Sequence, residues 1–125
     1  YMFKKRNGKL FAGPLWDFDW GTFQAYKGVC NSESLWYDYL FKYTEFKNAV
    51  KKRWAETKES YMSMDTYIAA TAAYIQESDK VNFKMWPIDM DVNGDETCTF
   101  NEAINLMRSS YQTRLEFVES YISGL

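Results

Sequence analysis

The order of apolar and polar residues predicts a short hairpin followed by helices. Residues 1–13 read as two short strands, and Asn7 and Gly8 supply the turn because both residue types accept positive φ. Residues 14–32 show no sustained period, so we expect a structured loop there. From residue 33 onward, apolar residues recur at steps of three and four, the period of an amphipathic helix.

Residues 33–78 predict three helices joined by short turns. The first spans residues 33–43, and the second begins with Thr44 as its N-cap. The third begins at Ser63 or Asp65. The predicted inward faces of the three helices are, in order, Leu35, Trp36, Tyr39, Leu40 and Tyr43; Phe46, Ala49, Val50, Arg53 and Trp54; and Tyr67, Ile68, Thr71, Ala72 and Ile75.

The last helix has the clearest period. Residues 79–98 lack a period and contain Pro87, so we expect them to form a long connection. Thr99 and Glu102 then form the two ends of a capping box. The helix that follows ends at Gly124. Its predicted inward face is Ile104, Met107, Tyr111, Leu115, Val118 and Ile122.

These elements predict an α+β fold that is mostly helical, with residues 1–125 forming a single unit. Hydrophobic residues make up 46% and charged residues 26% of the chain, which is a globular balance. A net charge of -2 supplies no basic field for a nucleic-acid partner. No apolar run is long enough for a transmembrane helix. Because the chain has no histidine, it cannot itself supply a Ser-His-Asp triad, a Cys-His dyad or a His-ligated zinc site.

The first candidate for chemistry is a pair of acids within an aromatic run. Asp17 and Asp19 alternate with Trp16, Phe18 and Trp20. In extended backbone, residues two apart point to the same side, so the two carboxylates can share a divalent cation such as Mg²⁺. Acids among aromatic rings are costly unless they are paired or metal-bound. The plainer alternative, which the triplet alone favours, is that they cap helix ends or pair with Lys or Arg.

The residues around this pair resemble the signature of the CotH (spore coat protein H) kinase family. Residues 9–21, KLFAGPLWDFDWG, resemble its hairpin that leads into Gly-Pro-x-Trp-Asp-x-Asp. Residues 46–54 are similar to its F-x-x-x-V-x-x-R-W helix. Residues 99–102 and the closing helix with Arg114 are similar to its TFxxE start and terminal Arg-bearing helix. The resemblance runs from about residue 1 to 122.

The resemblance implies the C-terminal part of an atypical, kinase-C-lobe-like protein kinase domain. Such a kinase transfers phosphate from Mg-ATP to Ser or Thr of secreted or coat proteins, so the implied location is extracellular, at the cell surface or in the spore coat. Asp17 then corresponds to the metal-binding Asp, and Asp19 to a second metal-binding or structural acid. The ATP-contacting Lys and the catalytic-loop Asp and Asn would lie before Tyr1. We therefore expect the chain alone to be inactive, and we expect its partner to be a protein substrate.

A second acidic run resembles the first half of a calcium-binding EF-hand loop. Asp89, Asp91, Asn93 and Asp95 stand at alternate positions, with a glycine at the sixth. The second half departs from the motif because Phe100 stands where the bidentate Glu belongs. We therefore expect a polar turn, with a weak extracellular-type Ca²⁺ site as the alternative.

Aromatic residues are unusually frequent, with 5 Trp, 10 Tyr and 9 Phe. We expect most to lie in the core, since large exposed aromatic patches reduce solubility. The alternative is a non-catalytic cell-surface module that binds a glycan or a protein through exposed rings.

Two smaller features also leave alternatives open. A basic helix face is expected to be solvated, although it is also suited to attracting an acidic substrate or a phosphate; it consists of Lys47, Lys51, Lys52, Arg53 and Lys58. Cys30 and Cys98 can form a disulfide in an exported protein, and we expect free thiols because nothing in the sequence brings them together.

Overall fold

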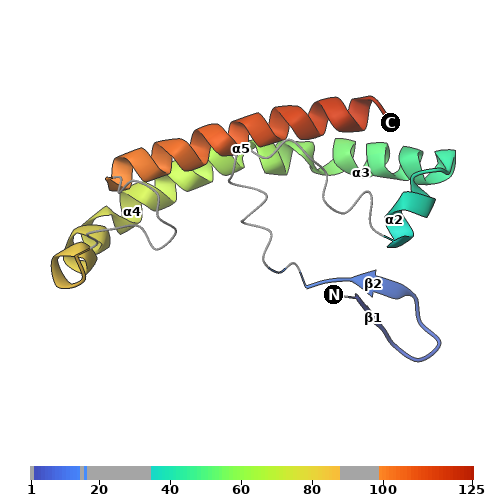
Figure 1. The fold of residues 1–125 in the computed structure, drawn as a ribbon, viewed down its shortest axis with the longest axis horizontal. Helices are drawn as coiled ribbons and strands as arrows, with labels where there is room; N and C mark the ends of the chain where they lie inside the picture. The colour runs from blue at the N-terminus through green and yellow to red at the C-terminus, as the bar shows by residue number, and fades with distance from the viewer. Residues whose placement is uncertain (1, 15, 17–34, 88–98) are drawn as a thin grey trace.

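The computed structural model describes residues 2–14, 16, 35–87 and 99–125, and it is mostly helical with a hairpin at its N-terminus (Figure 1). This confirms the predicted α+β composition. The described elements are β1 (Met2–Lys4), β2 (Leu10–Ala12), α2 (Leu35–Leu40), α3 (Thr44–Met62), α4 (Met64–Met85) and α5 (Phe100–Ser123).

The hairpin forms as predicted. β1 and β2 pair antiparallel, with Phe3 opposite Phe11. Their rings stack with centroids 5.3 Å apart. Asn7 adopts a φ of 60°, and the Gly8 N–H donates to the Lys5 carbonyl over 2.9 Å, so local turn chemistry sets the register. All six strand residues are exposed.

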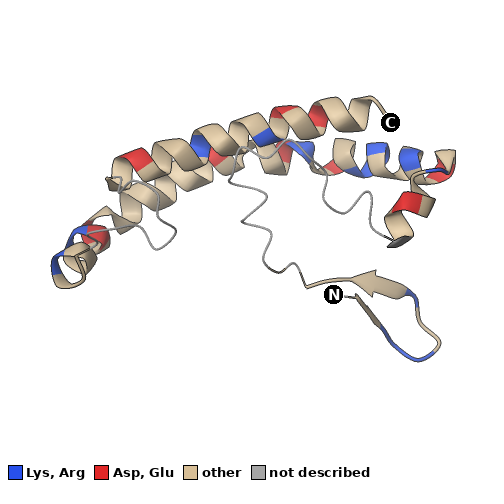
Figure 2. Ribbon diagram, viewed as in Figure 1, with Lys and Arg blue, Asp and Glu red and all other residues tan. Residues whose placement is uncertain are grey.

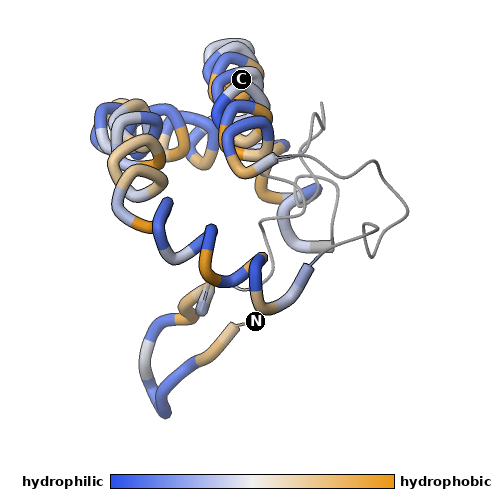
Figure 3. The backbone as a smooth tube through the Cα atoms, turned by 90° about the vertical axis from the view of Figure 1, so that its left-hand side faces the viewer, coloured by the Kyte–Doolittle hydropathy of each residue, from blue (hydrophilic) through white to orange (hydrophobic). Residues whose placement is uncertain are grey.

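α3 and α4 follow one another almost without a break, and α5 runs back along both (Figure 1). Ser63, between α3 and α4, keeps right-handed helical dihedrals of -71° and -11°. Its N–H donates to Glu59 and its carbonyl accepts from Tyr67, so the backbone bonds continue across the junction. Viewed end-on, hydrophobic and hydrophilic residues alternate around each helix (Figure 3).

Two predicted helix ends were wrong at the N-terminal side of this assembly. α2 ends at Leu40 rather than at residue 43, because residues 41–43 form a turn. Tyr43 is the N-cap of α3, and Thr44 is its first helical residue. No side chain caps this end, so the hydroxyl of Thr44 gave a misleading start signal.

The long connection predicted for residues 79–98 was also wrong in its first part, because α4 continues to Met85. Trp86 leaves the helix with dihedrals of -128° and 72°, away from the α region that a following proline disfavours. Pro87 thus stops the helix only at its immediate neighbour. Residues 81–87 are all exposed. Because these last turns of the helix pack against no other element in the described part of the chain, their sequence does not have to place apolar residues at helical spacing.

The core lies where α4 crosses α5. Its buried apolar residues are Ile68, Ala72 and Tyr111, and Ser110 is buried beside them. The predicted face of α5 is confirmed, since Tyr111 is buried and its five other members are half-buried. Several residues predicted to face inward on the earlier helices are instead exposed, because no described element covers their side of the assembly; these are Trp36, Tyr39, Leu40, Tyr43, Ala49, Arg53, Tyr67 and Ile75.

Candidate functional site

The predicted acid pair, Asp17 and Asp19, lies outside the described residues. The structure does describe the approach to it. After β2, Gly13 has a φ of 135°, a value that L side chains rarely adopt. A Cβ built at Gly13 meets nothing within 4 Å, so the backbone conformation alone calls for glycine. Trp16, which directly precedes Asp17, is 67% exposed.

The predicted calcium loop also lies outside the described residues, with Asp89, Asp91, Asn93 and Asp95. Cys30 and Cys98 do so as well, so their pairing stays a prediction. Within the described ranges, no group of three or more His, Cys, Asp or Glu side chains is placed to hold a metal ion. In the same ranges, no helix is both long and apolar enough to cross a membrane.

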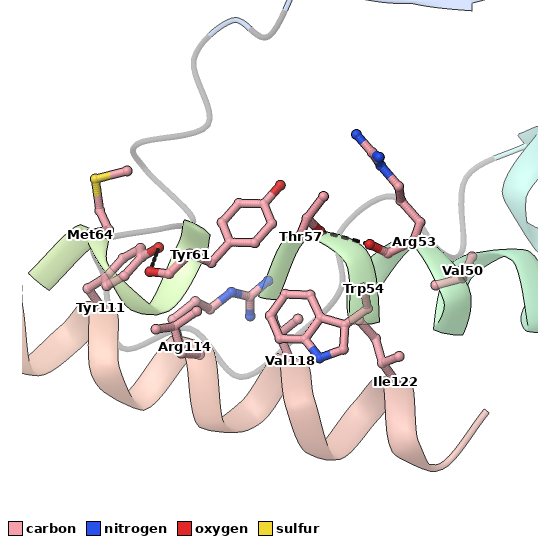
Figure 4. Close-up of a pocket in the computed structure, with 11 residues that line it drawn as sticks. Val50, Arg53, Trp54, Thr57, Tyr61, Met64, Tyr111, Arg114, Val118 and Ile122 are labelled. Carbon is pink, nitrogen blue, oxygen red and sulfur yellow. Dashed lines mark hydrogen bonds between the residues drawn. The ribbon is translucent and has the colours of Figure 1, made fainter. Parts of the chain in front are cut away.

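A groove lies between α3 and α5 (Figure 4). Its volume is about 590 Å³. Arg114 extends from α5 toward α3, whereas Arg53 points away from α5 (Figure 4). The lining residues in the described part of the chain are mostly apolar and include no carboxylate: Val50, Arg53, Trp54, Thr57, Tyr61, Met64, Tyr111, Arg114, Leu115, Val118 and Ile122.

Aromatic stacking shapes the floor of this groove. The rings of Trp54 and Tyr61 stack with centroids 5.6 Å apart and planes 19° from parallel. Arg114 lies over the ring of Phe117, with its guanidinium carbon 5.2 Å from the centroid. These contacts fix flat apolar surfaces beside cationic groups.

A polar clasp, made of Glu119, Trp54 and Lys58, joins the same two helices. Glu119 Oε2 accepts from the indole Nε1 of Trp54 at 2.6 Å, and its Oε1 accepts from Lys58 Nζ at 3.0 Å. The bonds from Lys58 and Trp54 hold the pKa of Glu119 below its ordinary value. A second hollow of about 310 Å³ lies here, and its lining includes Glu116 as well as Glu119. Lys58 also lines this second hollow, so cationic and anionic side chains meet there.

A second clasp joins α4 to α5. Arg108 donates from Nε to Asp65 Oδ1 at 2.7 Å and from Nη2 to Oδ2 at 2.8 Å, a bidentate pair. This pairing lowers the pKa of Asp65 and raises the pKa of Arg108. Nearby, the Tyr111 hydroxyl donates to the Tyr61 carbonyl at 3.0 Å, and burial raises the pKa of Tyr111.

The basic face expected from the sequence is divided by the structure. Lys58 turns into the Glu119 clasp, and Arg53 lines the groove, where it pairs with Glu56 at 3.3 Å. Lys51 and Lys52 remain exposed along α3 (Figure 2). The basic residues thus serve different surfaces rather than one patch.

Sequence reasoning missed the groove itself. The signal that points to it is the row Val50, Trp54, Thr57 and Tyr61, which follows helical spacing along α3. The row extends past the predicted inward face into hydroxyl-bearing residues. Only the pairing of α3 with α5 shows that it borders an open hollow.

No protein-family model matches the chain, and neither a curated protein nor a solved structure does.

Proposed function

We propose that this chain is the C-terminal part of a CotH-like protein kinase domain, which transfers phosphate from Mg-ATP to Ser or Thr of secreted or coat proteins. The observation that carries the proposal is the run of residues 9–21, in which Gly13-Pro14 leads into Trp16-Asp17-Phe18-Asp19. The hairpin that leads into Gly13-Pro14 supports it, since a short hairpin also precedes the metal-binding motif in protein kinases.

The donor set suits magnesium. Mg²⁺ prefers one or two carboxylates, with water and phosphate oxygens completing its octahedron. Asp17 would hold the ion and Asp19 would share or support it, with the rings of Trp16, Phe18 and Trp20 limiting water around them. When bound, the metal neutralises charge on the phosphates, which is the main requirement of phosphoryl transfer.

In this proposal the described helices are a scaffold rather than a catalytic centre. The hairpin exposes Phe3 by 52% and Phe11 by 50%, and a two-stranded hairpin alone is only marginally stable in water. Exposed apolar strands of this kind are consistent with packing against further parts of a kinase domain.

The test uses a longer polypeptide that adds the residues encoded before Tyr1. We expect Mg-dependent transfer of the γ-phosphate to a protein, and we expect Asp17→Asn to reduce it by about a hundredfold or more, because the metal loses a ligand. Asp38→Asn is the matched control, since Asp38 is an exposed acid on α2 whose ion pair is a local one with Lys42, in the turn after that helix. It should leave the rate unchanged.

The 125-residue chain alone should not turn over ATP, because half of the catalytic groups are supplied elsewhere. Phosphate transfer by the pure chain that Asp17→Asn abolishes would contradict this part of the proposal. Equal rates for Asp17→Asn and wild type in the longer polypeptide would contradict the whole.

One observation favours a second candidate function, a non-catalytic glycan-binding or protein-binding module at the cell surface. Trp36, Tyr39 and Tyr43 follow one another at helical spacing on and just after α2, exposed by 58%, 66% and 59%. Exposed rings in a row are suited to stacking on sugars. A thermal shift of the longer protein with oligosaccharide but not with Mg-ATP, lost in Trp36→Ala, would support this module over the kinase.

A further inference from the structure

The turn of the hairpin contains two neighbours that can react with each other. Asn7 and Gly8 lie between β1 and β2, and both are exposed. In such a pair, the backbone nitrogen of the second residue can attack the side-chain amide carbon of the asparagine, so that ammonia leaves and a cyclic succinimide forms. Glycine as the second residue hinders this attack least, because it has no side chain and a permissive backbone.

The folded turn restrains the attacking nitrogen. The Gly8 N–H donates to the Lys5 carbonyl over 2.9 Å, and the nitrogen attacks only after it has lost that proton. The same turn holds Asn7 at a φ of 60°. A nitrogen that keeps its hydrogen bond in a fixed backbone is a poor nucleophile. The reaction is therefore expected from molecules in which the hairpin has opened locally.

Opening of the hairpin requires little free energy. Its strands have three residues each, all exposed, and in the described part of the chain they pair only with each other. A two-stranded hairpin of this kind is marginally stable in water. Asn48 and Asn105 are exposed as well, but they lie within α3 and α5, where the helix keeps the next N–H bonded. The backbone around Asn7, rather than exposure alone, therefore distinguishes it from these two.

The charges around the turn favour the first step of the reaction. Residues 2–14 contain no acid. They contain four cations close to the turn, namely Lys4, Lys5, Arg6 and Lys9. The attacking form of the Gly8 nitrogen has lost its proton and is negative. Nearby positive charge favours such an anion over its neutral form.

We propose that Asn7 is a site of spontaneous deamidation, reached through local opening of the hairpin. The Gly8 nitrogen gives its proton to a base in the solvent and bonds to Cγ of Asn7. The bond from Cγ to the side-chain nitrogen breaks, and that nitrogen takes up a proton and leaves as ammonia. Water then adds to either carbonyl of the succinimide, which gives Asp through one carbonyl and isoAsp through the other. One water is consumed, one ammonia is released, and nothing is oxidised or reduced.

The modification changes both the charge and the register of the hairpin. Four cations and no acid give residues 2–14 a charge of +4, so one new carboxylate lowers it to +3. In isoAsp the chain continues through the side-chain carbon, which adds a backbone atom inside the turn. The bond from Gly8 to Lys5 and the pairing of Phe3 with Phe11 then no longer fit the same turn. This chemistry does not depend on the proposed function.

The experiment incubates the full 125-residue chain in mildly alkaline buffer at physiological temperature and samples it over several weeks. Peptide mapping by mass spectrometry assigns each conversion of Asn to an acid. It thereby separates Asn7 from the second Asn-Gly pair, at Asn93, which lies outside the described residues. We expect Asn7 to react at least about tenfold faster than Asn48 and Asn105, because the hairpin opens more readily than the helices. Labelling by an isoaspartyl methyltransferase should mark the isoAsp share of the Asn7 product.

Two Phe variants test the opening step. Phe11→Ala removes the ring that stacks on Phe3 and should speed the deamidation of Asn7 about threefold, because cross-strand aromatic pairs stabilise the closed hairpin. The matched control is Phe83→Ala, which removes a ring that is 41% exposed on α4, outside the hairpin. It should leave the rate at Asn7 unchanged.

Two outcomes would overturn the proposal. The first is a rate at Asn7 no higher than the rates at Asn48 and Asn105, including a reaction confined to Asn93. The second is the same rate at Asn7 in wild type and in Phe11→Ala, because opening of the hairpin would then not control the reaction.

Discussion

The two halves of α5 meet different partners and pack differently against them. Its N-terminal half crosses α4 and contributes Ser110 and Tyr111 to the buried core. Its C-terminal half runs beside α3, which has no buried residue, and two hollows are lined by this pair of helices. The same helix is thus the centre of a core at one end and the wall of a groove at the other.

The residues at the two contacts differ, although large residues occur at both, since Ile68 and Tyr111 are buried at the α4 contact. The distance between packed helices depends on the side chains that separate them. Small residues stand at the α4 contact, including Ala72 and Ser110, whereas Trp54 and Leu115 stand at the α3 contact. Polar contacts join α5 to both helices, through Asp65 and Arg108 at α4 and through Glu119 with Trp54 and Lys58 at α3.

The largest expected effect comes from breaking the buried half. Tyr111→Ala removes a buried ring and its bond to the Tyr61 carbonyl, and should lower the free energy of unfolding by about 3 kcal/mol. Tyr111→Phe keeps the ring and should cost only about 1 kcal/mol. Ile122→Ala, in the half-buried part, should cost about 1 kcal/mol. Urea unfolding followed by circular dichroism measures all three. A loss for Ile122→Ala as large as that for Tyr111→Ala would contradict the contrast between the halves.

A smaller effect is expected at the start of α5. The Thr99 hydroxyl accepts from the Glu102 N–H at 3.3 Å, and the Glu102 carboxylate accepts from the Thr99 N–H at 2.7 Å. Thr99→Ala breaks this capping box and should cost about 1 kcal/mol in urea unfolding. Ser123→Ala, at the other end of α5, makes no cap and should change stability little. Equal losses in the two variants would show that the box contributes nothing.

The smallest expected effect is on the pH dependence of stability, to which the two clasps contribute separately. Hydrogen bonds and ion pairs lower the pKa of Asp65 and Glu102 in the first half and of Glu119 in the second. A lowered pKa means that the unfolded chain binds protons more readily, so this stability is complete above about pH 5 and is lost as the pH falls through the folded pKa values. Glu119→Gln should remove the contribution that this carboxylate makes to the pH dependence of stability. The fall in Tm between pH 5 and pH 3 should then be shallower.

The control for this pH series is Glu45→Gln, an exposed carboxylate on α3 at the far end from Glu119. It should leave the acid dependence of Tm as in wild type. If Glu119→Gln also leaves it unchanged, the clasp to Trp54 and Lys58 does not stabilise the fold.

Elements fixed by nearby residues were predictable from the sequence. The turn at Asn7 and Gly8, the box at Thr99 and the apolar face of α5 each follow from residue types close together in the sequence. The end of α4 was not, because a missing period in residues 79–85 reflects the lack of a packing partner rather than the lack of a helix. The groove depends on how α3 and α5 sit together, which spacing within either helix does not reveal. The acid pair at Asp17 and Asp19 stays a prediction from its motif.

The two-stranded ribbon has a consequence for the handling of the pure chain. In the part of the chain that the structure describes, β1 and β2 have only each other as neighbours, so each leaves one row of amide and carbonyl groups open to a strand of another molecule. Four cations gather toward the ribbon's tip, namely Lys4, Lys5, Arg6 and Lys9 (Figure 2). Their mutual repulsion keeps two ribbons from joining edge to edge, and concentrated salt would weaken that protection first.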